Sequence, residues 1–263
     1  MNLKQKRILL TGATGGLGQE LALLLAQKGA VLTLVGRDKT KLNLLKDLIE
    51  KNGGKAYFQV ADLNEVDVSR DIISLAKHLM GDIDVLINNA GVLDFIKFGQ
   101  QSDARIAEMI HTNVTAPIQL ARAIIGQFQA KNQGHIVFVG SIFGSLAYPH
   151  FSTYCASKFA VHGFSQALRR ELLGSNIGIT YLAPRGIKTA MNDANTVAMW
   201  NKVGNKMDDP LTVAKRIVKA LEREQQEVFI GVSESFFAWL NGLFPRVISL
   251  GLKAPTLIAR QFL

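Results

Sequence analysis

The sequence Thr11-Gly12-Ala13-Thr14-Gly15-Gly16-Leu17-Gly18 decides the fold of this chain. It joins a short apolar run, residues 7–10, to a segment of helical period, residues 19–28. Glycines permit positive φ in a tight turn and close approach of the backbone to a pyrophosphate, and a helix N-terminus adds unpaired N–H groups. Such a turn also occurs without a ligand, but here it opens the first strand–helix unit, with glycines spaced as Gly16-x-Gly18. We predict a dinucleotide-binding loop at residues 11–18.

Outward from this loop, apolar runs alternate with longer segments of helical period. The central runs are apolar without alternation, which is typical of parallel strands buried on both faces. Asp38 can cap a helix over residues 39–51, and Asp209-Pro210 can open one that ends near Arg223. The pattern predicts an α/β fold, a doubly wound Rossmann sheet of about seven parallel strands flanked by helices. The expected strands are residues 7–10, 31–35, 56–60, 83–87, 135–139, 177–182 and 227–230.

Composition argues against several classes of protein. The 263 residues include one cysteine, Cys155, so no intramolecular disulfide can form, and no Cys/His cluster has metal-site spacing. The net charge is +9, but the basic residues are scattered with few aromatics among them, which argues against nucleic-acid binding. The N-terminus lacks the apolar core of a signal peptide, so we expect a cytoplasmic protein. The lack of Cys/His clusters leads us to expect no metal site.

The end of the second expected strand indicates the cofactor. A dinucleotide fold that uses NAD usually places an acidic residue there for the ribose 2′-OH, whereas an arginine accommodates a 2′-phosphate. This chain has Gly36-Arg37-Asp38, with glycine at the acidic position. The alternative is that Arg37 is a solvated charge and Asp38 merely a helix cap. The pattern favours NADP(H) over NAD(H).

Downstream residues supply groups for proton transfer. Tyr154 and Lys158 stand at i and i+4 in a segment of helical character that runs from near Ser152 to about Leu173. A neighbouring ammonium lowers the pKa of a tyrosine, so Tyr154 could give a proton to a carbonyl or take one from an alcohol. Ser141, at the end of the fifth expected strand, could hydrogen-bond the same oxygen. Alone, such a pair is usually surface chemistry; together with the glycine loop it predicts hydride-transfer chemistry.

These features together resemble the short-chain dehydrogenase/reductase family, over nearly the whole chain to about residue 232. The matching motifs share their order and spacing with the family. They are the loop at residues 11–18, Ala61-Asp62-Leu63, Asn88-Asn89-Ala90-Gly91, Asn113, Ser141 and Tyr154-x-x-x-Lys158.

The resemblance implies a role for each matching residue. Tyr154 would be the general acid/base, Lys158 would lower its pKa and bind the nicotinamide ribose, and Ser141 would orient the substrate carbonyl. Asn113 would help hold a water that links Lys158 to solvent. The implied cofactor-binding residues are Gly12, Thr14, Gly16, Leu17, Gly18, Arg37, Asp62, Leu63, Asn89, Ala90, Gly91, Tyr154, Lys158, Ile187 and Thr189.

One departure from the family pattern follows the sixth expected strand. The family has Pro-Gly there, with a threonine four residues beyond that glycine. This chain reads Pro184-Arg185-Gly186-Ile187-Lys188-Thr189, with Arg185 in the glycine's place. Arg185 could bind a cofactor phosphate or an acidic substrate group, or be a solvated charge. Thr189 and Ile187 keep their positions for nicotinamide contacts.

The substrate side is rich in aromatic and apolar residues, which favours a lipophilic carbonyl or alcohol. Residues 190–208 have few periodic signals, so we expect a mobile lid there within a catalytic domain that spans residues 1–232. The expected lining residues are Leu93, Phe95, Ile96, Phe98, Ile142, Phe143, Leu146, Tyr148, Phe151, Met191, Met199 and Trp200.

The tail, residues 233–263, is apolar but interrupted by Asn241, Pro245 and Arg246, so a transmembrane helix is not expected. Three interpretations stay open. It could be a subunit-interface element of a homo-oligomeric dimer or tetramer, an amphipathic hairpin on a membrane surface, or a cap over a lipophilic substrate.

The favoured function is an NADP(H)-dependent reductase or dehydrogenase that interconverts a carbonyl and a secondary alcohol, with a fatty-acyl-type substrate as one candidate. A cofactor-binding sensor or scaffold without catalysis is the alternative, although such proteins usually lose the tyrosine or the lysine. A third hypothesis is a protein that mainly contacts a membrane surface or an acyl-carrier protein, based on the tail and the net charge.

Overall fold

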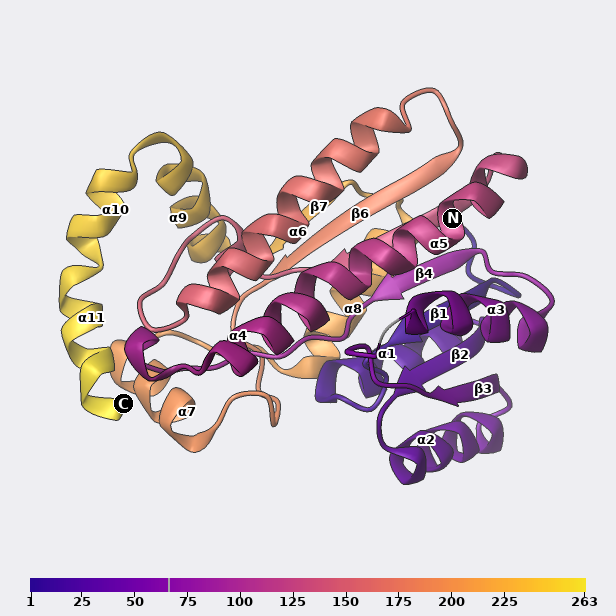
Figure 1. Ribbon diagram of the computed structural model, residues 1–263, viewed down its shortest axis with the longest axis horizontal. Coiled ribbons are helices and arrows are strands. Elements are labelled where there is room, and N and C mark those ends of the chain that lie inside the picture. Colours follow the sequence, from indigo (N-terminus) through magenta and orange to yellow (C-terminus); the bar gives the residue numbers. More distant parts are fainter. Residues whose placement is uncertain (66) are drawn as a thin grey trace.

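The computed structural model describes residues 1–65 and 67–263. Within those residues, seven parallel strands form one sheet in the order β3-β2-β1-β4-β5-β6-β7, and Figure 1 shows it flanked by helices. The predicted doubly wound α/β fold is confirmed. The strands are β1 (Arg7–Thr11), β2 (Val31–Gly36), β3 (Lys55–Val60), β4 (Val85–Asn88), β5 (Gly134–Val139), β6 (Ile177–Pro184) and β7 (Glu227–Ile230).

Two apolar cores hold the helices on the sheet. One core joins α1, α2 and α8 to one face, and the other joins α3, α5 and α6 to the opposite face. The helices are α1 (Gly16–Gln27), α2 (Lys39–Lys51), α3 (Val68–Met80), α4 (Asp103–Ile110), α5 (Ala116–Ala130), α6 (Ser152–Glu171), α7 (Ala194–Val203), α8 (Pro210–Glu222), α9 (Val232–Leu243), α10 (Pro245–Gly251) and α11 (Lys253–Ala259). Shorter turns are η1 (Phe98–Gln100), the π-turn η2 (His111–Thr115), η3 (Ile142–Gly144) and η4 (Arg260–Phe262).

The chain reverses its direction of travel across the sheet at β1 and β4, which pair although they are not consecutive. The connections after these two strands therefore leave toward opposite sides. In open α/β sheets, ligands bind at the carboxyl ends of strands beside such a switch point. The glycine loop after β1 and the Asn88-Asn89 pair at the end of β4 both lie there.

Helix ends follow local capping chemistry. The carboxylates of Asp38 and Asp209 accept hydrogen bonds from the N–H groups of Lys41 and Thr212, at 3.0 and 3.2 Å, as capping residues do. Helix α1 begins at Gly16, earlier than the expected residue 19, so the end of the glycine loop forms its first turn.

The expected lid contains a helix, α7, which the sequence does not indicate. Asp193 accepts a hydrogen bond from the Thr196 N–H at 2.7 Å and starts α7, and Gly204, at φ +82°, ends it. The two ends of the segment are joined, because the Asp208 N–H donates to the Gly186 carbonyl at 2.8 Å. The Asp, Asn and Gly residues that read as a loop in the sequence include the two caps of this helix.

The tail forms three short helices, α9, α10 and α11, which make a bracket at one end of the molecule (Figure 1). Pro245 starts α10 after a break at Phe244, and Leu252 separates α10 from α11. Among the described residues, no helix is both long and apolar enough to cross a bilayer.

Candidate active site

The glycine loop is shaped by contacts that exclude larger side chains. Gly12 has φ +64°, and a Cβ there would lie 2.7 Å from the Ala90 Cα. A Cβ on Gly18 would lie 2.1 Å from the Gly12 carbonyl oxygen, and one on Gly16 would lie 2.8 Å from Thr189. The loop therefore brings the backbone of the first turn of α1 against its neighbours, as the sequence pattern predicts.

Asn89 and Thr11 hold this loop against the end of β4. The Asn89 side-chain amide donates to the carbonyls of Thr11 and Gly12, both at 3.1 Å. The Thr11 hydroxyl accepts from the N–H groups of Asn89 and Ala90, both at 3.1 Å. The loop is thus held against the end of β4, and the N-terminus of α1, which has no side-chain cap, lines the cavity.

A cavity of about 380 Å³ runs along the carboxyl ends of the strands. Its lining includes Arg37 after β2, Asp62 after β3 and Tyr154 on α6. Every residue predicted for the cofactor lines it, and so do Ser141, Tyr154 and Lys158; Asn113 does not. The structure thus brings residues from six strand ends and α6 together around one space.

Tyr154 and Lys158 point from α6 toward the end of β5. The Lys158 ammonium lies 5.5 Å from the Tyr154 ring centroid and donates to the Val139 carbonyl at 3.1 Å. The Ser141 hydroxyl accepts from the Phe143 N–H at 3.1 Å, which orients it at the start of η3. The three side chains therefore meet at the inner end of the cavity.

The pKa shifts differ from the sequence expectation. Burial raises the pKa of Tyr154 to about 12, and the hydrogen bond with Ser141 only partly offsets this. Burial also lowers the pKa of Lys158 to about 8. Desolvation of the phenolate is the largest cause of the shift in the Tyr154 pKa, so burial opposes the lowering that the sequence predicts from Lys158. A tyrosine that stays protonated at neutral pH is suited to donate a proton.

Asn113 sits in a π-turn between α4 and α5, a feature that is frequent at functional sites. Its side-chain oxygen accepts from the Val92 N–H at 2.8 Å, and its amide donates to the Val92 carbonyl at 2.8 Å and to the Ser157 hydroxyl at 3.0 Å. Ser157 in turn donates to the Tyr154 carbonyl at 2.7 Å. Asn113 thus lies behind the cavity and joins its wall to α6.

Tyr181, which the sequence did not single out, holds the segment around Ser141. It is fully buried in β6; its hydroxyl donates to the Ser141 carbonyl at 3.1 Å and accepts from the Ser141 N–H at 3.4 Å. Gly140 and Gly144 make room for it, because a Cβ on either would lie 2.2–2.3 Å from its side chain. In the sequence, the only indication of this contact is the presence of Gly140 and Gly144 on either side of Ser141 together with a tyrosine in β6.

We expect a Tyr181→Phe variant to lose about tenfold in kcat for carbonyl reduction, with the KM for the cofactor unchanged, because Ser141 loses its support. Unfolding should become easier by about 1–2 kcal/mol, as expected when buried hydrogen bonds are removed. Steady-state kinetics and thermal unfolding of the variant measure both effects. An unchanged kcat in a destabilised variant would leave Tyr181 with a structural role alone and contradict this expectation.

Arg185, for which the sequence leaves a cofactor phosphate, an acidic substrate group or solvent as partners, pairs with two carboxylates of the chain itself. Its guanidinium donates to both Asp208 oxygens, at 3.0 and 2.7 Å, and to Glu234 at 3.1 and 3.3 Å. It is therefore not a solvated charge. It ties the end of β6 to the end of the lid and to the first turn of α9.

The substrate side of the cavity is an aromatic cluster beside Tyr154. The Phe143 ring lies 6.3 Å from Tyr154, and Phe151 stacks on Trp200 with centroids 5.7 Å apart. The tail residues Leu252 and Ala259 pack on this cluster, which also includes Met199. Phe98, expected in the lining, is 63% exposed and is not part of it.

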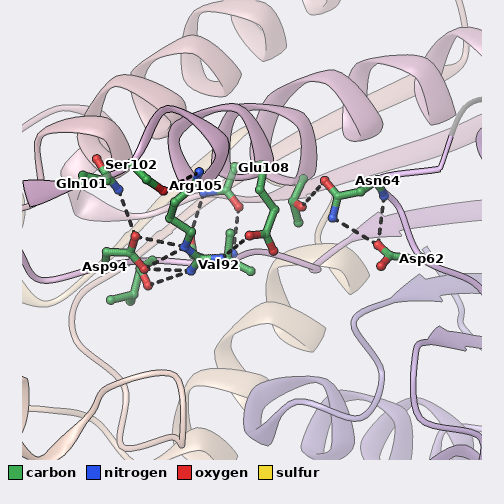
Figure 2. A network of polar contacts seen from close by, with 11 residues as sticks. Asp62, Asn64, Val92, Asp94, Gln101, Ser102, Arg105 and Glu108 are labelled. Carbon is green, nitrogen blue, oxygen red and sulfur yellow. Dashed lines mark hydrogen bonds and ion pairs between the residues drawn. The ribbon is translucent and has the colours of Figure 1, made fainter.

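A polar network fixes the segment after β4 that leads into α4. Asp94 accepts two hydrogen bonds from the Arg105 Nε and one from its Nη2, and a further one from Gln101, as Figure 2 shows. Thr153, next to Tyr154, donates to the Gln101 side chain at 2.5 Å. The network thus connects the cavity wall to α6.

Figure 2 also shows how Asp62 is held at the other end of the cavity. Its Oδ1 accepts from the N–H and the side-chain amide of Asn64, at 3.0 and 3.1 Å. Thr112, at the start of the helical segment toward α5, donates to the Asn64 side chain at 3.2 Å. The carboxylate is thereby oriented on the cavity wall, where the sequence placed an adenine contact.

The chain matches a family model and several known proteins. The model of the short chain dehydrogenase family matches residues 6–199. The chain is 30% identical to dehydrogenase/reductase SDR family member 7B of Danio rerio, over 93% of this chain and 83% of that protein. It is 29% identical to the ketoacyl reductase HetN of a Nostoc species, over 99% of this chain and 89% of that protein.

Solved structures share the fold. A short-chain dehydrogenase/reductase from Burkholderia phymatum in complex with NAD superposes with a TM-score of 0.86, at 21% identity, over 94% of this chain and 96% of that one. A single-residue variant of the actinorhodin polyketide ketoreductase with NADPH gives a TM-score of 0.77, at 22% identity, over 86% of this chain and 95% of that one. These two neighbours bind different nicotinamide cofactors.

Proposed function

The chain belongs to the short-chain dehydrogenase/reductase family of oxidoreductases, and on that premise we propose that it interconverts a lipophilic carbonyl and a secondary alcohol with NADP(H). The observation that carries the proposal is the meeting of Ser141, Tyr154 and Lys158 at the inner end of a cavity that the glycine loop also lines.

The residues around the cavity fit a nicotinamide dinucleotide. The cavity passes the α1 N-terminus, which suits a pyrophosphate, and reaches Arg37 and Asp62 toward β3 and Tyr154 toward β6. When bound, the nicotinamide supplies or accepts a hydride. The proposed binding residues are those implied by the family pattern, with Thr189 and Ile187 on the nicotinamide side.

Tyr154 is the proposed general acid for carbonyl reduction. Its raised pKa keeps the hydroxyl protonated at neutral pH, so it can donate a proton to a carbonyl oxygen, while Ser141 hydrogen-bonds the same oxygen. Lys158 is largely protonated below pH 8 and favours the phenolate that remains. Asn113 positions α6 through Ser157, and we propose that it supports proton resupply to Lys158.

The aromatic cluster beside Tyr154 supports a lipophilic substrate, with a fatty-acyl-type ketone as a candidate. The name of the relative HetN, a ketoacyl reductase, agrees with this candidate. Leu252, Ala259 and Phe262 pack on the cluster. We therefore propose that residues 233–263 cover the outer side of the substrate pocket, within a protein whose catalytic domain spans residues 1–232.

The reaction is tested by measuring NADPH oxidation with a panel of aldehydes, cyclic ketones and 3-ketoacyl thioesters of increasing chain length. We expect kcat/KM to rise with chain length for at least one class, because the cluster buries apolar surface. Turnover of small polar carbonyls alone would contradict the lipophilic assignment.

Arg37 is the proposed ligand of the 2′-phosphate. It is exposed, and its neighbour Asp38 is engaged by the N–H of Lys41. We expect Arg37→Ala to raise the KM for NADPH about 10- to 100-fold, the value of a charge-assisted hydrogen bond, and to leave that for NADH nearly unchanged.

Lys39→Ala is the matched control for this experiment, because Lys39 is exposed two residues away. It should change neither KM appreciably. Equal losses for NADPH and NADH in Arg37→Ala would show that Arg37 does not contact the phosphate.

Two expectations about the whole protein stay predictions, namely a cytoplasmic location and a homo-oligomer. Light scattering coupled to size-exclusion chromatography measures the second, for which we expect a dimer or a tetramer.

A further inference from the structure

The outer face of the tail is an apolar stripe without a partner in the described part of the chain. Val232, Phe236, Trp239 and Leu243 stand at i, i+4, i+7 and i+11 of α9, and all four are exposed. Phe236 and Trp239 contact each other, with ring centroids 6.0 Å apart. Together with the exposed apolar residues that follow α9, they form what we call the outer face: Val232, Phe236, Trp239, Leu243, Phe244, Val247, Leu250 and Leu257.

The opposite side of the same helices is already used. Ala238 and Ile248 are buried against Ile142 and Leu146, and Asn241 donates to the Ser145 carbonyl at 3.0 Å. The inner side of the tail is therefore the side that packs on the rest of the protein. The outer face is left exposed in this arrangement. Several large exposed apolar side chains on consecutive helices indicate an interaction site.

Basic residues continue along the outer face. Arg246, Lys253 and Arg260 are exposed and alternate with Leu250 and Leu257 at helical spacing from α10 to the start of η4. Residues 235–263 contain no aspartate or glutamate. The partner of this face must therefore accept both apolar side chains, including a tryptophan, and positive charge.

A bilayer containing anionic lipid meets this requirement. Helices that lie in the headgroup region bury apolar and aromatic side chains and place lysine and arginine against lipid phosphates. A second copy of the chain fits less well, because a two-fold interface would bring the same three basic side chains together without an acidic residue from positions 235–263 between them.

We propose that the outer face docks onto an anionic bilayer surface, with α9, α10 and α11 lying in the headgroup region. This inference does not depend on the proposed reaction. Two of the three interpretations of the tail then hold together, one for each side. The inner side covers the aromatic cluster, and the outer face contacts lipid.

The protein carries its own reporter for this contact. It has two tryptophans: Trp200 is buried and Trp239 is 60% exposed. Adding vesicles of phosphatidylcholine mixed with phosphatidylglycerol should shift the tryptophan emission to shorter wavelength, and high salt should reverse the shift. Pure phosphatidylcholine vesicles should produce a much smaller shift. A Trp239→Phe variant should still float with the anionic vesicles but show no shift.

The double variant Trp239→Ser/Leu243→Ser should lose about tenfold or more in vesicle partitioning, because two apolar side chains no longer enter the bilayer. Leu44→Ser is the matched control: Leu44 is exposed on α2, far from the tail, and its variant should float like the unmodified chain (Figure 1). Reductase activity should be unchanged in the control.

Either of two outcomes overturns the proposal. One is the absence of flotation with the anionic vesicles. The other is an oligomer that the Trp239→Ser/Leu243→Ser change dissociates while vesicle binding stays the same, which would assign the outer face to a second copy of the chain. Light scattering of the unmodified chain and of the Trp239→Ser/Leu243→Ser variant measures their oligomeric state. A variant that has lost its fold is recognised in the same measurement by aggregation.

Discussion

A Tyr154→Phe variant is expected to lose carbonyl reduction by about 10²–10⁴-fold, the range attributed to a positioned general acid, while it binds NADPH as tightly as the unmodified chain. The hydroxyl is the group lost, whereas the ring that contacts Phe143 and lies under the Lys158 ammonium is kept. Steady-state kinetics with the best substrate of the carbonyl panel, together with NADPH fluorescence titration, separate chemistry from binding.

Tyr57→Phe is the matched control for that experiment, because Tyr57 lies on β3 and does not line the cavity. It should be fully active. Full activity of Tyr154→Phe would remove this residue from the mechanism. Loss of NADPH binding in Tyr154→Phe would instead assign its hydroxyl to cofactor binding.

Gly18→Ala is expected to weaken NADPH binding by about 100-fold. A Cβ at this position would lie 2.1 Å from the Gly12 carbonyl oxygen and 3.0 Å from Ala13, so the loop must move away from the first turn of α1. Overpacking typically costs about 1–3 kcal/mol, and here the atoms in the way belong to the backbone that lines the cavity. Calorimetric titration of NADPH measures the loss.

The matched control is Gly126→Ala, at a glycine inside α5 where an added Cβ meets nothing within 4 Å. It should bind NADPH normally and be stabilised by about 0.5–1 kcal/mol, since alanine is the better helix former. Normal NADPH affinity in a folded Gly18→Ala protein would show that the tight loop is not needed for the cofactor.

The features that the sequence could predict are those that depend on residues close together in the chain. The caps at Asp38 and Asp209 and the buried strands depend on neighbours within a few residues or on apolar runs, and the structure confirms them. The residues around the cavity were predictable through the family's motifs, because equivalent strand ends always meet at the same edge of the sheet.

What the sequence could not predict depends on contacts between distant residues. Arg185 pairs with Glu234, 49 positions away, and Tyr181 supports Ser141 across 40 positions. The direction of the Tyr154 pKa shift is set by how deeply the side chain is buried, which its spacing from Lys158 does not reveal. Each of these features arises from packing of the tail, the lid or β6 around the site.

Hydride transfer is the central claim, and isotope transfer tests it most directly. NADPH deuterated at the transferable C4 position is incubated with the protein and the best carbonyl of the panel, and the alcohol is analysed by mass spectrometry and NMR. We expect one deuterium on the carbinol carbon, and a rate of alcohol formation that falls steeply in Tyr154→Phe. Alcohol without deuterium from either C4-labelled face, or no turnover of any carbonyl by a protein that binds NADPH, would contradict this claim.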